Sequence, residues 1–164
     1  MATMPTNIQY LYRDIQHVRA NQTEAGWTPY IPIELVQCGD WLRQNTPVNA
    51  AVIGFADDCS YIPGSADRAV WAGHWGETPD YKTKLLEFLI FANATTSDRG
   101  RRFFLGTTHA QYLIYPTDIE RESFVSQSGA RYEIADFAKT PPPYLSKVYQ
   151  NAKFAIFHID MNQP

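Results

Sequence analysis

The run from His74 to Thr78, which reads His-Trp-Gly-Glu-Thr, is the densest group of chemically versatile side chains in this sequence. It holds an imidazole, a carboxylate and a hydroxyl that can make hydrogen bonds, and an indole ring that offers an apolar face to a sugar. Asp57 and Asp58 form a short acidic run after an apolar segment. Side chains of these types bind sugars or anionic head groups, and the candidate ligand-binding residues are Asp57, Asp58, His74, Trp75, Glu77 and Thr78.

Two short strands are expected immediately before these side chains. Residues 50–55 form a continuous apolar run between turn residues, which is typical of a strand buried on both faces, and residues 68–73 form a second such strand. The carboxyl ends of parallel strands lie at one edge of a sheet, where open α/β proteins place their ligand crevices. A helix should follow, with Thr78 as its cap and Pro79 at its first position. We therefore expect the polar side chains to meet at this edge.

A purely structural role explains the same residues more simply. Thr78 is accounted for by capping, the flanking glycines by tight turns, and Trp75 by cover for the edge of the sheet. Ligand binding by these side chains is the alternative interpretation.

The sequence contains no motif that identifies a catalytic or metal centre. It lacks the G-x-S-x-G turn of hydrolases, the spaced glycines of a phosphate-binding loop and the H-E-x-x-H of zinc proteases. The two cysteines lie 21 positions apart without a C-x-x-C pair, so two unpaired thiols are expected, with a single bridge as the alternative. The histidines are scattered, so only the fold could assemble a shared metal site; they are His17, His74, His109 and His158. We expect no catalytic residue, metal or cofactor.

Length and composition define the class of protein further. A chain of 164 residues, 45% hydrophobic, is the size of one domain with one good core. The net charge is −3 and the basic residues form no long cluster, which argues against a nucleic-acid partner. The apolar stretches fall short of the roughly 20 residues that span a bilayer, and no signal peptide is visible. The isolated chain is expected to be soluble.

Apolar periodicity predicts an alternating order of helices and strands. One helix ends near Gln44, because Pro47 blocks its continuation, and the strongest helix runs from residue 79 to residue 92. Ser97 caps a further helix, which Gly106 closes. A strand at residues 111–115 and a hairpin at residues 144–159 complete the order.

These elements predict an α/β fold with a Rossmann-like open, mostly parallel sheet, helices on both faces and the C-terminal β-hairpin at the edge. The strands at residues 50–55 and 68–73 should form its centre. Residues 1–28 are expected to be a lead-in and residues 29–164 a single α/β domain. The side chains expected to be buried most deeply are Val52, Ile53, Val70, Leu85, Leu113 and Ile114.

An ordered string of short motifs carries a resemblance to a known family. The motifs lie at residues 41–47, 51–53, 61–63, 70–80 and 148–152, and the longest reads Val-Trp-Ala-Gly-His-Trp-Gly-Glu-Thr-Pro-Asp. In this order they resemble the C-terminal extracytoplasmic region of bacterial multi-pass membrane proteins described as glycosyltransferase-like or mannosyltransferase-like, of the GT-C type. The similarity covers roughly residues 30 to 160.

The resemblance implies a function located mostly outside these residues. Such enzymes use a polyprenyl-linked sugar and place the catalytic carboxylate near their first membrane helices. This chain would then be a non-catalytic cap domain at the extracytoplasmic face of the bacterial cytoplasmic membrane, with residues 1–28 as a juxtamembrane tether. Its partners would be the transmembrane portion of its own parent protein and a polyprenyl-linked sugar or glycan acceptor. The alternatives are an independent soluble sugar- or nucleotide-sugar-binding enzyme that uses the His74 loop, and a protein-interaction module.

Overall fold

The computed structural model describes residues 31–118, 124–125 and 131–163. The chain divides after Ile31, and the elements described below belong to its second unit, Pro32–Pro164. The predicted lead-in at residues 1–28 lies outside the described residues, so its boundary stays a prediction. The elements follow one another in the order α2 (Ile33–Asn45), β1 (Ala51–Ile53), α3 (Ala56–Cys59), α4 (Ile62–Ala66), β2 (Ala69–Val70), α5 (Tyr81–Ala92), α6 (Asp98–Thr108), β3 (Tyr112–Pro116), β4 (Phe124–Val125), β5 (Arg131–Tyr132), β6 (Leu145–Gln150) and β7 (Phe154–Ile159).

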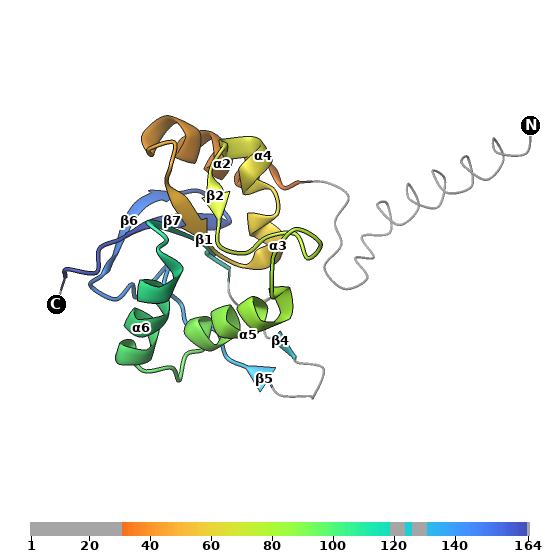
Figure 1. The fold of residues 1–164 in the computed structure, drawn as a ribbon. Coiled ribbons are helices and arrows are strands. Elements are labelled where there is room, and N and C mark those ends of the chain that lie inside the picture. The colour runs from red at the N-terminus through yellow and green to blue at the C-terminus, as the bar shows by residue number, and fades with distance from the viewer. Residues whose placement is uncertain (1–30, 119–123, 126–130, 164) are drawn as a thin grey trace, which may run out of the picture. The chain divides into compact units, whose positions relative to one another are not determined.

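Five of the strands form one mixed sheet in the order β2-β1-β3-β7-β6 (Figure 1). The strand β1 pairs in parallel with β2 and with β3, while β7 pairs antiparallel with both β3 and β6. Each antiparallel pair has five residues in register on each strand and each parallel pair only two. The expectation of a mostly parallel, Rossmann-like sheet is therefore wrong, although the α/β class, the parallel β1–β2 pair and the terminal hairpin are confirmed.

Successive side chains along each strand point to opposite faces of the sheet, so the core is divided into two layers. Ile53, Leu113 and Phe157 are cross-strand neighbours and pack with residues of α5 and α6. Val52 and Ile114 point to the other face and pack with residues of α2 and α4. Helices on both faces, as predicted, thus follow from the continuous apolar strands (Figure 1).

Two of the six side chains expected in the deep core are only half-buried. Val52, Ile53, Leu113 and Ile114 have relative exposures of 1% or less. Val70 is half-buried because β2, two residues long, is an edge strand with a single neighbour. Leu85 is half-buried as well, because Phe88, Leu89, Phe91 and Ala92 form the buried face of α5. The centre of the sheet is β3 and not the β1–β2 pair.

The side chain of Arg68 joins the C-terminal ends of two helices. It is only 6% exposed, and its guanidinium donates hydrogen bonds to five acceptors. Two of them, the carbonyl oxygens of Arg43 and Thr46, lie at the end of α2 at 3.0 and 2.7 Å. A third acceptor is the carbonyl oxygen of Ala66, the last residue of α4, at 3.1 Å from the guanidinium. The helix ends therefore have satisfied carbonyl groups although they are packed together.

Asn151 ties the turn of the β6–β7 hairpin to α2. Its Nδ2 atom donates to the Glu34 carbonyl oxygen at 2.7 Å, while its Oδ1 atom accepts from the Phe154 N–H at 2.9 Å. The rings of Trp41 and Tyr149 stack beside it with their centroids 5.6 Å apart. The first and last of the sequence motifs thus meet in space and stabilise the packing of α2 on the sheet.

Candidate functional site

The His74 run lies in a turn between β2 and α5. The backbone N–H of Gly73 donates to Oγ1 of Thr78 at 3.0 Å, and the N–H groups of Glu77 and Thr78 both donate to the His74 carbonyl oxygen at 3.1 Å. A side chain at position 73 would meet the Cγ2 atom of Val70 at 3.2 Å, so glycine lets the chain pass close to β2. These contacts close residues 73–78 into a compact turn, which we call the His74 turn.

The helix α5 begins two residues later than predicted. Thr78 was expected to cap it, but the helix runs from Tyr81, after Asp80 with a left-handed φ of 54°. The hydroxyl oxygen of Thr78 instead accepts the hydrogen bond of Gly73. Asp tolerates the left-handed region better than most residues, which explains how the chain turns sharply into the helix at this point.

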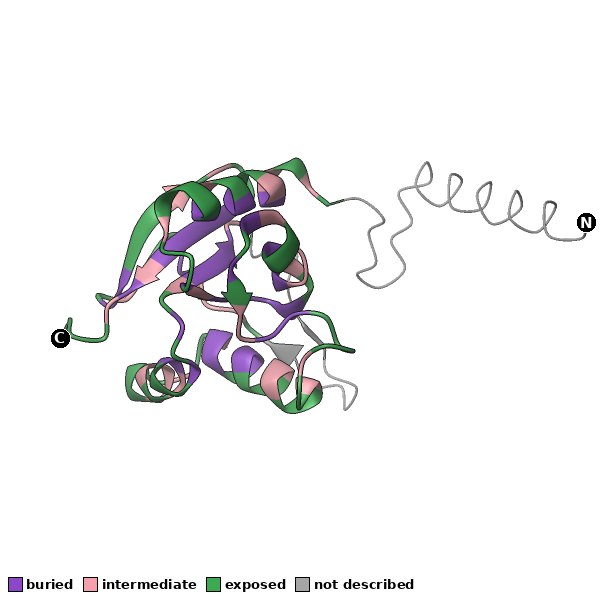
Figure 2. Ribbon diagram, turned by 45° about the horizontal axis from the view of Figure 1, so that its top comes forward, coloured by how far each residue is buried: buried purple, intermediate pink, exposed green. Residues whose placement is uncertain are grey.

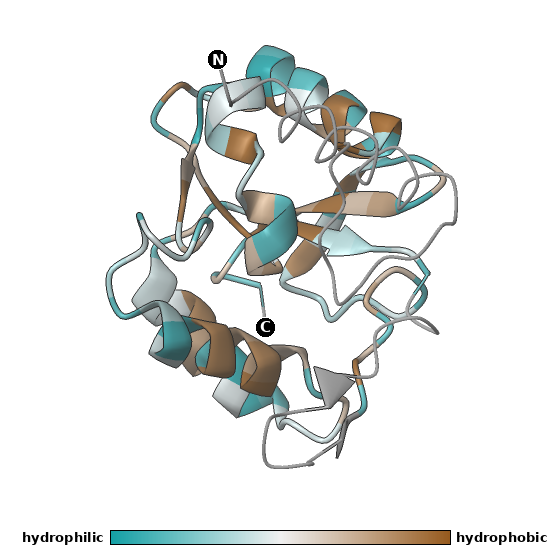
Figure 3. Ribbon diagram, turned by 90° about the vertical axis from the view of Figure 1, so that its right-hand side faces the viewer, coloured by the Kyte–Doolittle hydropathy of each residue, from teal (hydrophilic) through white to brown (hydrophobic). Residues whose placement is uncertain are grey.

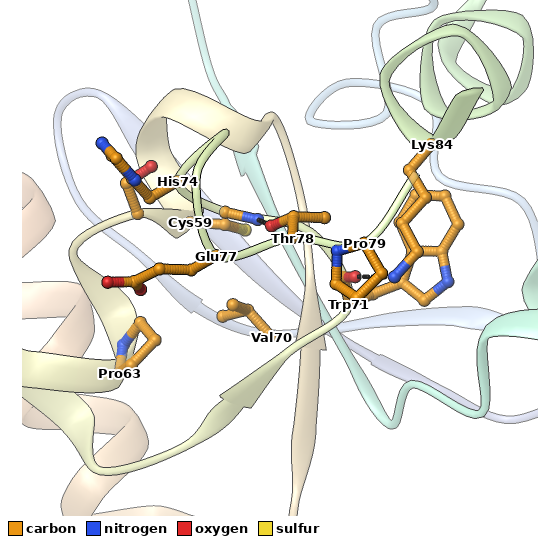
Figure 4. A pocket seen from close by; sticks show the side chains of 11 residues that line it. Cys59, Pro63, Val70, Trp71, His74, Glu77, Thr78, Pro79 and Lys84 are labelled. Atoms are coloured by element: carbon orange, nitrogen blue, oxygen red, sulfur yellow. Dashed lines mark hydrogen bonds between the residues drawn. The ribbon is translucent and has the colours of Figure 1, made fainter. Parts of the chain in front are cut away.

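A cavity of about 190 Å³ opens beside the His74 turn (Figure 4). His74, Glu77 and Thr78 line it, so the structure brings three of the six predicted ligand-binding residues to one surface. In Figure 4 the His74 and Glu77 side chains lie at one end of the cavity and Trp71 and Lys84 at the other, with Thr78 between them. A cavity thus lies at the end of β2, and the binding of a ligand in it stays a prediction.

His74 and Trp75 are exposed to solvent and contact each other. The Trp75 side chain is 72% exposed, and its ring centroid lies 5.5 Å from that of His74. The Nδ1 atom of His74 accepts from the N–H of Gly76 at 3.2 Å, which places the proton of the neutral imidazole on Nε2. Trp75 does not line the cavity but forms a free aromatic surface beside it.

The two aspartates do not join this cavity. They lie in the short helix α3, and neither of them lines the cavity. The pKa of Tyr81 is raised by burial and, less strongly, by the negative charge of Asp57. The negative charge of Asp58 raises the pKa values of Cys38 and Cys59, in addition to the larger effect of burial.

Lys84 is the main cavity residue that the sequence did not single out. Its Nζ atom donates to the Trp71 carbonyl oxygen at 2.9 Å and lies 5.3 Å from the centre of the Trp71 ring. The indole face and the carbonyl together hold the ammonium group at the cavity wall. Lys84 could have been found from its place in the first turn of α5, facing the end of β2.

Cys38 and Cys59 are both free and fully buried, so the expectation of two unpaired thiols is confirmed. Burial raises the pKa of Cys38 to about 12, against the opposing effect of a hydrogen bond from Asn151. Burial also raises the pKa of Cys59 well above the ordinary thiol value. Both thiols therefore stay protonated and weakly nucleophilic at neutral pH.

The cavity offers groups for binding more clearly than for covalent catalysis. The Ser60 hydroxyl donates to the Ala56 carbonyl oxygen at 2.9 Å, and the Thr78 hydroxyl oxygen accepts from Gly73. Neither hydroxyl is hydrogen-bonded to His74 or Glu77, as an activated nucleophile would be to its base. Within residues 31–118, 124–125 and 131–163, no three His, Cys, Asp or Glu side chains are grouped to hold a metal ion.

Comparisons with known proteins relate the fold to solved structures. The chain has the fold of the C-terminal globular domain of an oligosaccharyltransferase from Archaeoglobus fulgidus, with a TM-score of 0.59 over 80% of this chain and 99% of that one. The two sequences are 10% identical, so the similarity is one of fold. No protein-family model and no curated protein matches the sequence. No helix in the described part of the chain is both long and apolar enough to cross a membrane.

Proposed function

We propose that this chain is a non-catalytic accessory domain of a larger membrane-bound sugar transferase. The observation that carries the proposal is the fold shared with the C-terminal globular domain of an oligosaccharyltransferase. The similarity extends over 99% of that solved domain. The sequence resemblance to glycosyltransferase-like membrane proteins of the GT-C type supports it independently. The domain would lie at the extracytoplasmic face and contact the transmembrane portion of its parent protein.

In this proposal the cavity beside the His74 turn contacts a sugar of the glycan acceptor or of the lipid-linked donor. The Glu77 carboxylate is exposed and can accept hydrogen bonds from sugar hydroxyls, while the Nε2–H of His74 can donate one. The exposed Trp75 ring provides a stacking surface at the rim. A site this open is expected to bind a sugar at roughly millimolar affinity, or about 4 kcal/mol, which suffices when the rest of the protein holds the same substrate.

The parent protein is tested by sequencing the transcript that encodes this chain. The expected result is one continuous reading frame in which several apolar segments of roughly 20 residues precede Met1. A reading frame without such segments would overturn the assignment to a membrane protein.

The cavity is tested by titrating the purified chain with monosaccharides and following tryptophan fluorescence. Glu77→Gln should weaken binding by about tenfold, because the neutral amide is a poorer acceptor than the carboxylate. Asp57→Asn is the matched control, since it removes the same charge outside the cavity lining and should leave binding unchanged. Equal losses in both variants would contradict a site at the cavity.

A second candidate function is an independent sugar- or nucleotide-sugar-binding enzyme. It is favoured by the exposed imidazole of His74 and carboxylate of Glu77, which line the same cavity and belong to types used in general acid–base catalysis. Sugar turnover by the isolated chain would distinguish it from the accessory domain.

A further inference from the structure

The helices α5 and α6 both expose large apolar side chains, two on α5 and one on α6. On α5, Leu86 and Ile90 lie one turn apart and are 47% and 48% exposed, and Lys82 precedes them by another turn. On α6, Phe103 is 76% exposed and follows the exposed Arg99 by one turn. Each helix thus presents a cation followed by exposed apolar residues on one side, namely Leu86 and Ile90 on α5 and Phe103 on α6. We call these five residues the α5/α6 face.

The α5/α6 face is turned away from the sheet. Phe88, Leu89 and Phe91 of α5 and Leu105 of α6 are buried in the core, so the exposed side chains occupy the other sides of the helices. Buried and exposed segments alternate along both helices in Figure 2, and Figure 3 shows the long apolar run of α5. Large apolar side chains exposed together on neighbouring helices indicate a surface that meets a partner.

The charge of these helices is opposite to that of the whole chain. The chain carries a net −3, whereas α5 and α6 together carry five basic residues and two acidic ones, which gives +3. Three of the basic side chains are held by the fold: Lys84 by the Trp71 carbonyl, Arg101 by the Phe91 carbonyl, and Arg102 by Asp98 at 3.1 Å. Lys82 and Arg99 are exposed and make no hydrogen bond or ion pair with a described residue.

We propose that the α5/α6 face binds an anionic lipid surface. Exposed Phe and Leu side chains enter the boundary between head groups and acyl chains, while Lys and Arg beside them attract acidic lipid phosphates. Phe103, Leu86 and Ile90 supply the apolar contacts, and Lys82 and Arg99 supply the charge. An isolated acidic side chain, Glu87, lies on the exposed part of α5 and limits the affinity. The inference rests on this surface alone and holds whether or not the parent protein is a sugar transferase.

The test is flotation of the full 164-residue chain with vesicles of phosphatidylcholine, alone or mixed with phosphatidylglycerol. Binding is expected only to the mixed vesicles and should decrease as salt is raised. Lys82→Gln should lower the partition coefficient by about fivefold, because one cation near an anionic surface contributes about that much. Gly64→Glu is its matched control, since it lowers the net charge by the same unit at an open position of α4, on the other face of the sheet.

The contribution of the apolar side chains to vesicle binding is tested with Phe103→Ser. Val48→Ser is the control, since it removes an exposed apolar side chain outside the α5/α6 face. Phe103→Ser should reduce vesicle binding by about tenfold and Val48→Ser should leave it unchanged. Equal binding to both kinds of vesicle, no binding, or equal effects of the two substitutions would overturn the proposal. So would a change from dimer to monomer in Phe103→Ser without loss of vesicle binding, which would identify an interface between copies of the chain.

Discussion

The hydroxyl oxygen of Thr78 accepts a hydrogen bond from the backbone N–H of Gly73 at 3.0 Å. Together with the two hydrogen bonds to the His74 carbonyl oxygen, this contact closes the His74 turn, from which His74 and Glu77 line the cavity. Thr78 was predicted to cap a helix. Its hydroxyl group instead stabilises the turn that positions His74 and Glu77 at the cavity.

Replacing Thr78 by valine should destabilise the domain by about 1–2 kcal/mol, because the Gly73 N–H loses its acceptor in a half-buried position. Urea denaturation of the purified chain measures the change. Thr83→Val, an exposed position in α5, is the control and should change the free energy of unfolding by less than about 0.5 kcal/mol. Equal effects at both positions would show that the hydrogen bond does not hold the turn.

The glycine that follows β1 should tolerate no side chain. A Cβ atom at Gly54 would lie 2.6 Å from Cγ2 and 2.7 Å from the carbonyl oxygen of Ile114, in the neighbouring strand β3. Gly54→Ala should therefore cost about 1–3 kcal/mol through overpacking. Gly64→Ala has open space around it and should be neutral or stabilising by up to about 1 kcal/mol. Thermal unfolding of the two variants compares them, and a tolerated Gly54→Ala would contradict the close approach of β1 and β3.

The buried guanidinium of Arg68 should contribute strongly to stability. Arg68→Met leaves the carbonyl groups at the ends of α2 and α4 without their donor, and we expect a loss of about 2–4 kcal/mol. Chemical denaturation provides the measurement, with Arg99→Met as the exposed control that should change little. A small effect of Arg68→Met would mean that water satisfies these carbonyl groups.

Stability should decline in alkaline solution. The pKa values of Cys38, Cys59, Tyr81 and Tyr144 are all raised in the folded protein, chiefly by burial. Between the ordinary thiol value of 9.0 and about 12, the unfolded chain loses the Cys38 proton while the folded chain keeps it. The free energy of unfolding therefore falls as pH rises through this window.

Urea titrations on the two sides of pH 9.0 measure this decline. Cys38→Ala should make it less steep, because one of the four groups no longer titrates. A free energy of unfolding that is constant across the window would contradict the burial of these acids.

Much of the fold could be predicted from the sequence because it follows from local patterns. Two apolar segments on either side of the turn at Asn151 predict the hairpin, and the apolar spacing after Tyr81 predicts α5. The direction of β7 relative to β3 could not be read this way, because a buried apolar run such as Phe154–Ile159 looks the same in a parallel and an antiparallel sheet. Only the antiparallel pairing of β7 with β3 in the folded structure shows that the sheet is mixed.

Three of the six residues predicted to bind a ligand line the cavity, and their role in binding stays a prediction. His74, Glu77 and Thr78 line one cavity because all three lie in the single turn that follows β2. Asp57 and Asp58 were expected there too, but they lie in α3 and do not line the cavity, and a four-residue helix leaves hardly any periodic signal in a sequence.

The proposed accessory role predicts that this domain has no activity of its own. Its most direct test is incubation of the purified chain with lipid-linked and nucleotide-linked sugars, followed by measurement of released or transferred sugar. His74→Ala and Glu77→Ala variants are assayed beside it, since both side chains line the cavity. We expect no turnover above the uncatalysed rate in any of the three proteins, because no cavity hydroxyl is hydrogen-bonded to His74 or Glu77. Turnover by the unaltered chain that disappears in either variant would contradict the accessory role and identify an independent enzyme.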